Sequence, residues 1–328
     1  GCTLNRVEQI YESLAQLGFA CSTTELTVLI FRLLAGVFVG GIFVGMLTYI
    51  VNIAKPEDQG KYLTVSAIIN AVAGAFGYLI GGLIGEFSIQ LTFWVQSASL
   101  CIAGVAFLLI CQNDAQPGEK PSAKQLLVQA NPLQAFLDCK YFMNAGFVLL
   151  FLLCALMNFA NTGFDQAFNY YLQDQLSLTS SYNGIIKAAV GMVTFVFNTT
   201  LCVWIIRKTF RPLSLTVLVA VCALSAVCTL LIPDLWLFII CCVLVYAGYS
   251  VSIPVLQSMV ADQADPAQKN LVMGVYNAAK SLGSVIGSLT VGFIYSLHAK
   301  LPFACVALIY GLCVLVAMGY WLFGKRRK

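Results

Sequence analysis

The stretch VNIAKPEDQGKYLTVSAIINAVAGAFGYLIGGLIG, from Val51 to Gly85, contains a short charged turn followed by a long apolar run rich in glycine. The same plan returns as VADQADPAQKNLVMGVYNAAKSLGSVIG, from Val260 to Gly287. Internal duplication of a helical unit is typical of membrane transporters. The repeat therefore predicts an all-α protein that is built from two related halves.

The two copies carry matching residues in the same order, and six apolar segments fill the span between equivalent positions. Each copy has a proline in the turn, then a lysine, an Asn-Ala pair and two glycines four residues apart. The matched positions are Pro56 and Pro266, Lys61 and Lys269, Asn70-Ala71 and Asn277-Ala278, and the glycine steps Gly77–Gly81 and Gly283–Gly287.

The glycines of both copies predict helices that approach one another closely. Small residues allow such approach and also allow helices to slide, so their recurrence in both halves favours a gating interface. Close packing without movement is the alternative. The glycines assigned to this interface are Gly74, Gly77, Gly81, Gly82, Gly85, Gly283 and Gly287.

The composition is that of a polytopic membrane protein. Of the 328 residues, 60% are hydrophobic and only 10% are charged, far less charge than a soluble domain of this size carries. The 13 cysteines lie mostly inside apolar runs, with no CxxC pair and a single histidine, His298. We interpret the cysteines as small apolar residues, and we predict no metal and no cofactor.

Nine apolar segments are long enough to cross the membrane, which takes around 20 helical residues for about 30 Å of hydrocarbon. A polar start, residues 1–12, and the short apolar segment Leu14–Ala20 precede them. The long segments are Leu26–Ala54, Tyr62–Gly85, Leu91–Cys111, Gly146–Leu172, Asn183–Ile206, Pro212–Ile232, Leu235–Met259, Asn270–Leu297 and Pro302–Phe323.

A break in hydrophobicity from Gln112 to about Ala145 holds three prolines and most of the local charge, which indicates a cytoplasmic linker between two halves. With this linker inside, only Lys300 falls outside among the loops after the first spanning helix, as the positive-inside rule requires. The net charge of +4 therefore reflects membrane-flanking loops and not nucleic-acid binding. The residues placed inside are Lys55, Lys61, Lys120, Lys124, Lys140, Arg207, Lys208, Arg211, Lys269 and the C-terminal Lys325–Lys328 cluster.

The repeat also predicts which helices of the complete fold this chain contains. The helix ending at Met259 is the fourth after the linker, so its counterpart ending at Ala54 should be the fourth of the first half. Only a partial third helix precedes that segment, and we expect two and a half helices of a six-plus-six plan to be missing. The expected domains are residues 1–111 (partial helix 3, helices 4–6), the linker 112–145 and the six-helix bundle 146–328.

Two stretches resemble the signatures of the major facilitator superfamily. LIFRLLAGVFVGG, with Arg32 and Gly36, is similar to the fourth-helix signature of an intramembrane Arg followed by Gly. GAFGYLIGGLIG is similar to the fifth-helix antiporter signature through Gly77, Gly81 and Gly82, although Tyr78 replaces the proline of that signature. The resemblance covers Leu14 to Phe323 and is strongest to the drug:proton antiporter branch, which includes multidrug and tetracycline exporters.

This resemblance implies a secondary transporter that works by alternating access. It implies proton-coupled efflux of small lipophilic or drug-like molecules across a bacterial plasma membrane, with the linker and C-terminus cytoplasmic. The expected partners are a small-molecule substrate, protons and the lipid bilayer, with no nucleic acid, and the expected state is a monomer. Gly36 joins the helix-packing glycines on this basis.

Four charged side chains within spanning segments are the candidates for coupling, because such charges are costly and usually face a cavity or a partner. The resemblance gives Arg32 a part in proton coupling, whereas its place near one helix end also allows it to extend to the interface. Lys280 lies deepest, about 15 Å into its helix. It is interpreted either as a charge coupled to substrate or protons, or as one half of a buried ion pair.

Asp165 belongs to a polar stripe with spacings of 3, 4 and 4 residues, which places all its members on one helix face. Such a face meets a wet cavity or another helix. Asp165 is interpreted either as a proton-exchanging group or as the ion-pair partner of Lys187. The predicted cavity-lining residues are Asn158, Asn161, Asn169 and Tyr170 on this segment, Thr194 and Asn198 on the face that Lys187 heads, and Asn277.

The same sequence is compatible with two functions other than export. A sugar or metabolite transporter of the same superfamily is the first alternative, and a truncated product that transports nothing is the second. The sequence has no GxxxxGK[ST] motif, so the energy source is an ion gradient or the substrate's own gradient. It also has no HExxH and no GxSxG, and we therefore do not expect an enzyme.

Overall fold

The structure, a computed structural model, describes residues 2–54, 58–110, 143–208, 210–231, 234–265 and 268–326. All regular elements in these ranges are helices. The chain forms two compact units, which we call the N-terminal unit (Gly1–Lys120 with Thr179–Ala188) and the C-terminal unit (Pro121–Leu178 with Ala189–Lys328). The turns with Pro56 and Pro266, and nearly all of the expected linker, lie outside the described residues.

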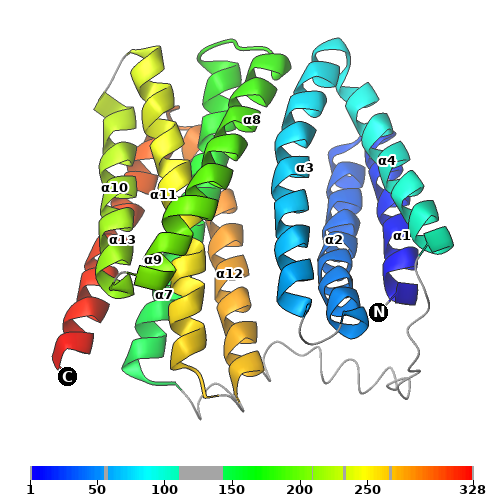
Figure 1. Cartoon of the computed structure of the whole chain (residues 1–328). Coiled ribbons are helices and arrows are strands. Elements are labelled where there is room, and N and C mark those ends of the chain that lie inside the picture. The colour runs from blue at the N-terminus through cyan, green and yellow to red at the C-terminus, as the bar shows by residue number, and fades with distance from the viewer. Residues whose placement is uncertain are drawn as a thin grey trace. The chain divides into compact units, whose positions relative to one another are not determined.

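The N-terminal unit contains four long helices (Figure 1). The first of them packs against both the second and the fourth, and it meets the fourth through Ser13 and Ser97. Each of these serine hydroxyls donates to the other residue's backbone carbonyl at 2.9 Å, which requires the two helices to lie close together. The helices are α1 (Cys2–Ala20), α2 (Glu25–Ile53), α3 (Gln59–Phe87) and α4 (Ile89–Ile110).

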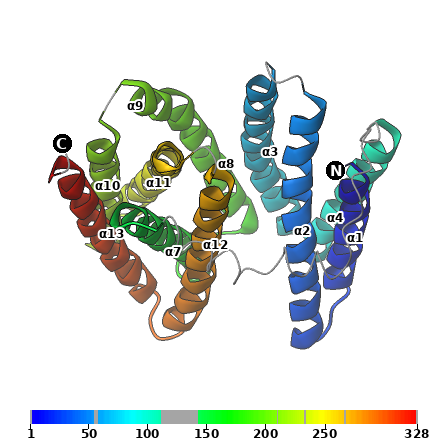
Figure 2. The same ribbon diagram turned by 90° about the horizontal axis from the view of Figure 1, so that it is seen from below.

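The C-terminal unit is arranged around one helix, α7, which contacts α11, α12 and α13 (Figure 2). Most of its core side chains, including Phe164 and Phe168, are fully buried. Asn144 caps the start of α7 by accepting from the backbone N–H of Phe147 at 3.0 Å. The elements are α7 (Ala145–Asp174), the part of α8 (Ser180–Phe197) that follows Ala188, the π-helix η2 (Asn198–Cys202), α9 (Val203–Lys208), α10 (Arg211–Leu231), α11 (Leu235–Gln263), α12 (Lys269–Tyr295) and α13 (Leu301–Arg326).

The expected positions of the spanning helices are confirmed. Each of the nine long apolar segments coincides with helix to within a few residues, the fifth of them as α8, η2 and α9 in succession. Eight helical segments of the described chain are long and apolar enough to cross a membrane. The short first segment differs, because α1 begins at Cys2 and the polar residues before Leu14 are helical as well. Because it contains these eight apolar helices, the chain is an integral membrane protein.

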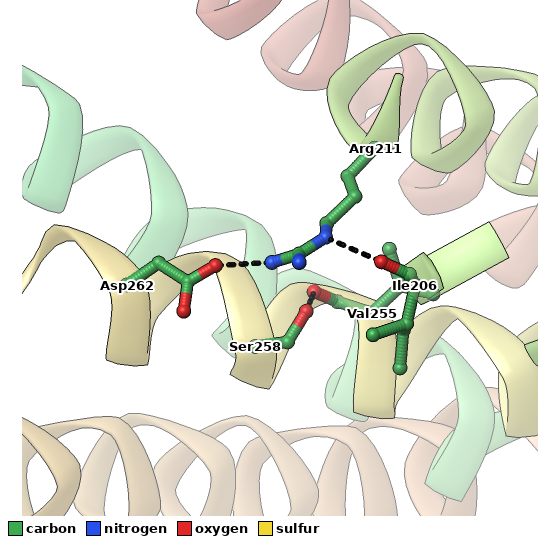
Figure 3. A network of polar contacts seen from close by, with 5 residues as sticks. All are labelled: Ile206, Arg211, Val255, Ser258 and Asp262. Carbon is green, nitrogen blue, oxygen red and sulfur yellow. Dashed lines mark hydrogen bonds and ion pairs between the residues drawn. The ribbon is translucent and has the colours of Figure 1, made fainter. Parts of the chain in front are cut away.

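One end of the C-terminal unit gathers helix termini that are far apart in the sequence. Gln263, at the end of α11, donates to Asn144 Oδ1 at 3.1 Å and accepts from the Tyr320 hydroxyl of α13 at 3.4 Å. Arg211, at the start of α10, pairs with Asp262 and donates through Nε to the Ile206 carbonyl at 3.2 Å (Figure 3). Several of the basic residues expected on one membrane side thus flank a single end of this unit.

The ion pair between Arg211 and Asp262 is expected to contribute little to stability. Both side chains are partly exposed, at 29% and 65%, and exposed pairs are typically worth about 0.2–1 kcal/mol. Asp262→Ala should therefore lower the free energy of unfolding by less than about 1 kcal/mol. Arg211→Ala should cost more, because it also removes the hydrogen bond to Ile206. Thermal unfolding of both variants and their double variant gives the coupling, and a value above about 2 kcal/mol would contradict this expectation.

Candidate functional site

The central polar feature of the C-terminal unit is a pair of hydrogen bonds that join α7 to α11. Tyr246 donates its hydroxyl to Asp165 Oδ1 at 2.8 Å, and Tyr249 donates to Asn158 Oδ1 at 2.7 Å. The two tyrosines are three residues apart on α11, and their acceptors are seven apart on α7, so each pair shares a helix face. We call these four residues the α7–α11 ladder.

Two further members of the predicted stripe lie beside the ladder. Asn169 donates to Asp165 Oδ2 at 3.4 Å, so both carboxylate oxygens act as acceptors. Asn161 lies between the two rungs along α7, and its Oδ1 is buried without a hydrogen-bond partner among the described residues. A buried acceptor of this kind is costly unless a donor reaches it, which makes this part of the ladder suited to bind a donor group.

The hydrogen bond between Tyr249 and Asn158 is continued by further contacts toward α12. Asn158 Nδ2 donates to the Cys154 carbonyl at 2.8 Å, and the Cys154 thiol lies 3.8 Å from the Tyr276 carbonyl. Lys280 lies within electrostatic range of this thiol. Its side chain is exposed, as is that of Asn277, and it makes no ion pair with a described residue. The structure therefore places Lys280 near the ladder without joining it to a carboxylate.

Lys187 is a buried side chain of α8, with 5% of its surface exposed. It belongs to the N-terminal unit and Asp165 to the C-terminal unit, so the ion pair expected between them stays a prediction. Further along α8, the Thr194 hydroxyl donates to the Gly191 carbonyl at 2.9 Å. Asn198 opens the π-helix η2, and its Oδ1 is buried without a partner in the described part of the chain.

Arg32 is held by aromatic rings of the N-terminal unit. Its guanidinium carbon lies 4.2 Å from the ring centre of Phe19 on α1 and 5.7 Å from that of Phe93 on α4. The two rings meet edge to face at 4.6 Å. Cation–π contacts of this kind fix the position of a charge without neutralising it. The sequence predicted that Arg32 lies in a helix, but it did not indicate that Phe19 and Phe93 contact its side chain.

Three of the predicted interface glycines make close contacts in the described chain. In the C-terminal unit, a Cβ at Gly283 would lie 2.1 Å from the Ala155 carbonyl oxygen, and one at Gly287 would lie 2.3 Å from that of Phe159. In the N-terminal unit, a Cβ at Gly82 would lie 2.7 Å from the Cα of Gly184. A Cβ at Gly85 would lie 3.3 Å from the Ser180 Cβ, a looser contact. The remaining four predicted positions have no described atom within 4 Å of a Cβ: Gly36, Gly74, Gly77 and Gly81.

Tyr170 lies near the opposite end of α7 from the Asn144 cap and is 45% exposed. Its ring packs against that of Tyr295 on α12 at 5.3 Å, and the Tyr295 hydroxyl donates to Asp174 Oδ2 at 3.1 Å. The neighbouring aromatics Phe164 and Phe168 are fully buried against Tyr246. These two rings therefore fill the core, and only Tyr170 of this group presents a large exposed surface.

A recess of about 640 Å³ lies between α2 and α3 in the N-terminal unit. This volume is within the range of small-molecule sites. Its walls are largely apolar, and their polar groups come from Tyr49, Tyr62, Ser66 and the carboxylate of Asp58. These residues could not be selected from the sequence, because they lie in different helices. No group of three or more His, Cys, Asp or Glu side chains in the described ranges is placed to hold a metal ion.

Comparison with known proteins identifies the family. The family model described as Major Facilitator Superfamily matches residues 12–232 and 211–328. Multidrug resistance protein 2 of Bacillus subtilis (strain 168) is 22% identical over 322 residues, covering 96% of this chain and 77% of that protein. Multidrug efflux pump SdrM of Staphylococcus aureus (strain N315) is 24% identical over 356 residues, covering 91% and 78%.

Solved structures show the same fold. A bacterial homologue of the human lysosomal transporter Spinster, in an inward-facing and unoccupied conformation, superposes with a TM-score of 0.72 at 13% identity. The match covers 98% of this chain and 82% of that one. Because the family model spans nearly the whole sequence, the chain belongs to the Major Facilitator Superfamily of membrane transporters.

Proposed function

We propose that this transporter exports small lipophilic or drug-like molecules in exchange for protons, by alternating access. The observation that carries the proposal is the carboxylate of Asp165, held in a spanning helix by Tyr246 and Asn169. An ionisable side chain at such a position is costly, and it is a functional candidate by default. The names of the two multidrug relatives support the substrate class.

The ladder supplies a physical link between proton binding and helix contact. Both hydrogen bonds to Asp165 use the carboxylate as an acceptor, so both are strongest while it is ionised. Protonation converts one oxygen into a donor and weakens the contact between α7 and α11. A ligand or proton that favours one arrangement of these helices shifts the equilibrium between inward and outward states.

The proposed arrangement in the membrane follows from the basic residues. The linker, Arg207, Arg211 and the C-terminal tail are placed in the cytoplasm of a bacterial cell, and the chain works as a monomer. Cysteine labelling from either side of the membrane at position 207 and in the tail tests this topology. Labelling from opposite sides would overturn the two-halves interpretation.

The proposed activity is tested with the full-length transporter in proteoliposomes that are acidic inside. A fluorescent lipophilic cation such as ethidium should accumulate in the vesicles as protons leave, and an ionophore that collapses the pH gradient should abolish this accumulation. Accumulation that is unaffected by the ionophore would exclude proton coupling. Gradient-driven movement of a sugar with no movement of the dye would favour the metabolite transporter instead.

Asp165→Asn is expected to uncouple transport from the proton gradient. The amide keeps the size of the side chain but cannot ionise, so gradient-driven accumulation should fall by at least about 10-fold, within the usual range of coupling energies. Downhill dye exchange without a gradient should persist. Asp174→Asn on the same helix is the matched control and should behave as wild type, because Asp174 is exposed. Equal loss in both variants would contradict the role of Asp165.

A further inference from the structure

Most buried thiols of the C-terminal unit serve packing. Those of Cys154, Cys202 and Cys222 lie 3.7–3.9 Å from backbone carbonyls of neighbouring helices, so each has an acceptor within the protein core. Cys228 on α10 and Cys241 on α11 differ, because their thiols interact with each other. These two residues form a pair of free thiols across a helix–helix contact.

The packing of α10 on α11 independently places these residues at a similar height along the two helices. The two helices are antiparallel neighbours, and the Cys222 sulfur lies 3.7 Å from the Val245 carbonyl and 2.5 Å from the Cβ position of Gly248. Moving six residues forward from Cys222 reaches Cys228, and moving seven back from Gly248 reaches Cys241. The two steps are about 9 Å and 10.5 Å along the helix axes. The same register therefore places the two cysteines at a similar height on adjacent helices.

The pair lies close to the helix ends, where reagents can reach it. Cys228 is three residues before the end of α10, about 5 Å along the axis, and Cys241 is six residues after the start of α11, about 9 Å. Both are partly exposed. The buried cysteines Cys222 and Cys313, which also interact electrostatically, are fully inaccessible. This end of the unit is opposite to the Arg211–Asp262 pair.

We propose that Cys228 and Cys241 form a two-thiol site for soft, thiophilic centres such as trivalent arsenic. Thiol sulfur is the soft ligand that such centres prefer, and two thiols held by adjacent helices bind one centre as a chelate. With phenylarsine oxide, two As–S bonds form and two S–H bonds break, and the arsenic-bound oxygen leaves as water. Arsenic keeps its oxidation state, so no oxidant is required. The site is independent of the proposed transport mechanism.

The test uses the full-length protein in detergent, incubated with phenylarsine oxide and then with a maleimide, followed by mass spectrometry of the cysteine peptides. In wild type, Cys228 and Cys241 should be protected together. A dithiol such as dimercaptopropanol should reverse the protection, whereas an equal concentration of a monothiol should not. Cys305→Ser is the control, because Cys305 is also partly exposed but lies on α13. It should leave the protection unchanged.

Single replacements decide whether the two thiols act together. Cys241→Ser should expose Cys228 to maleimide at arsenical concentrations that protect it in wild type, with an affinity loss of about 100-fold, and Cys228→Ser should expose Cys241 in the same way. Cys→Ala versions repeat the test if a serine variant does not give a monodisperse protein. Protection of Cys228 that is unchanged by loss of Cys241, or free maleimide reaction of both in wild type, would overturn the proposal.

Discussion

Lys280→Ala is expected to abolish substrate transport while leaving the amount of folded protein in the membrane unchanged. Lys280 lies 11 residues into the 27-residue helix α12, about 16 Å from its start and near mid-membrane. A lysine at the centre of a spanning helix costs about 2.5–3.5 kcal/mol on insertion scales. Removing it should therefore not weaken insertion, and the expected loss of transport follows from the predicted role of its charge in coupling.

The measurement is dye accumulation in proteoliposomes, normalised to the amount of reconstituted protein. Lys300→Ala is the matched control, because Lys300 is exposed in the loop before α13, outside the spanning segments. It should transport at the wild-type rate. Lys280→Arg keeps the charge and should retain part of the activity. Wild-type accumulation in Lys280→Ala would remove Lys280 from the mechanism, and the protein would then use its other charged side chains.

Gly283→Leu is expected to prevent stable folding of the C-terminal unit. A Cβ at this position would lie 2.1 Å from the Ala155 carbonyl oxygen, a backbone atom that cannot rotate away. Even alanine forces α7 and α12 apart, and overpacking of this kind typically costs about 1–3 kcal/mol. Leucine adds three more carbons against the same backbone. We expect Gly283→Ala to lower the melting temperature by several degrees and Gly283→Leu to leave little monodisperse protein.

Gly274 provides the matched control on the same helix, because no described atom lies within 4 Å of its Cβ position. Gly274→Ala should raise the free energy of unfolding by about 0.5–1 kcal/mol, since alanine is the better helix former. The three variants can be compared by size-exclusion chromatography after heating. Similar melting temperatures for Gly283→Ala and Gly274→Ala would show that α7 and α12 are not in backbone contact.

The helices themselves were predictable because bilayer thickness sets their length and a spanning helix satisfies its own backbone. The polar face of α7 was predictable for a similar reason, since spacings of 3 and 4 residues place Asn158 and Asp165 on one face. The residues that donate hydrogen bonds to these two side chains were not predictable from the sequence. Tyr246 and Tyr249 lie about 80 to 90 residues later, and only the packing of α11 on α7 selects them.

Two further features depend on tertiary structure. The π-helix at Asn198–Cys202 breaks the regular period of α8, so a face read from Lys187 onward does not continue into α9. The glycine steps look alike in sequence, yet Gly283 and Gly287 meet the α7 backbone while Gly77 and Gly81 meet no described atom. Sequence spacing identifies a face that is able to pack, whereas the neighbouring helix determines whether it does.

The contact between α7 and α12 has a mechanical consequence. Ala155, Phe159 and Gly163 meet Gly283, Gly287 and Val291 in turn, so the two helices run parallel with one shared step of four residues. Where carbonyl oxygens approach glycine Cα atoms directly, no flexible side chain is present to absorb a shift of one helix along the other. We therefore expect the two helices to move together during a transport cycle, and a gating role for Gly283 and Gly287 stays a prediction.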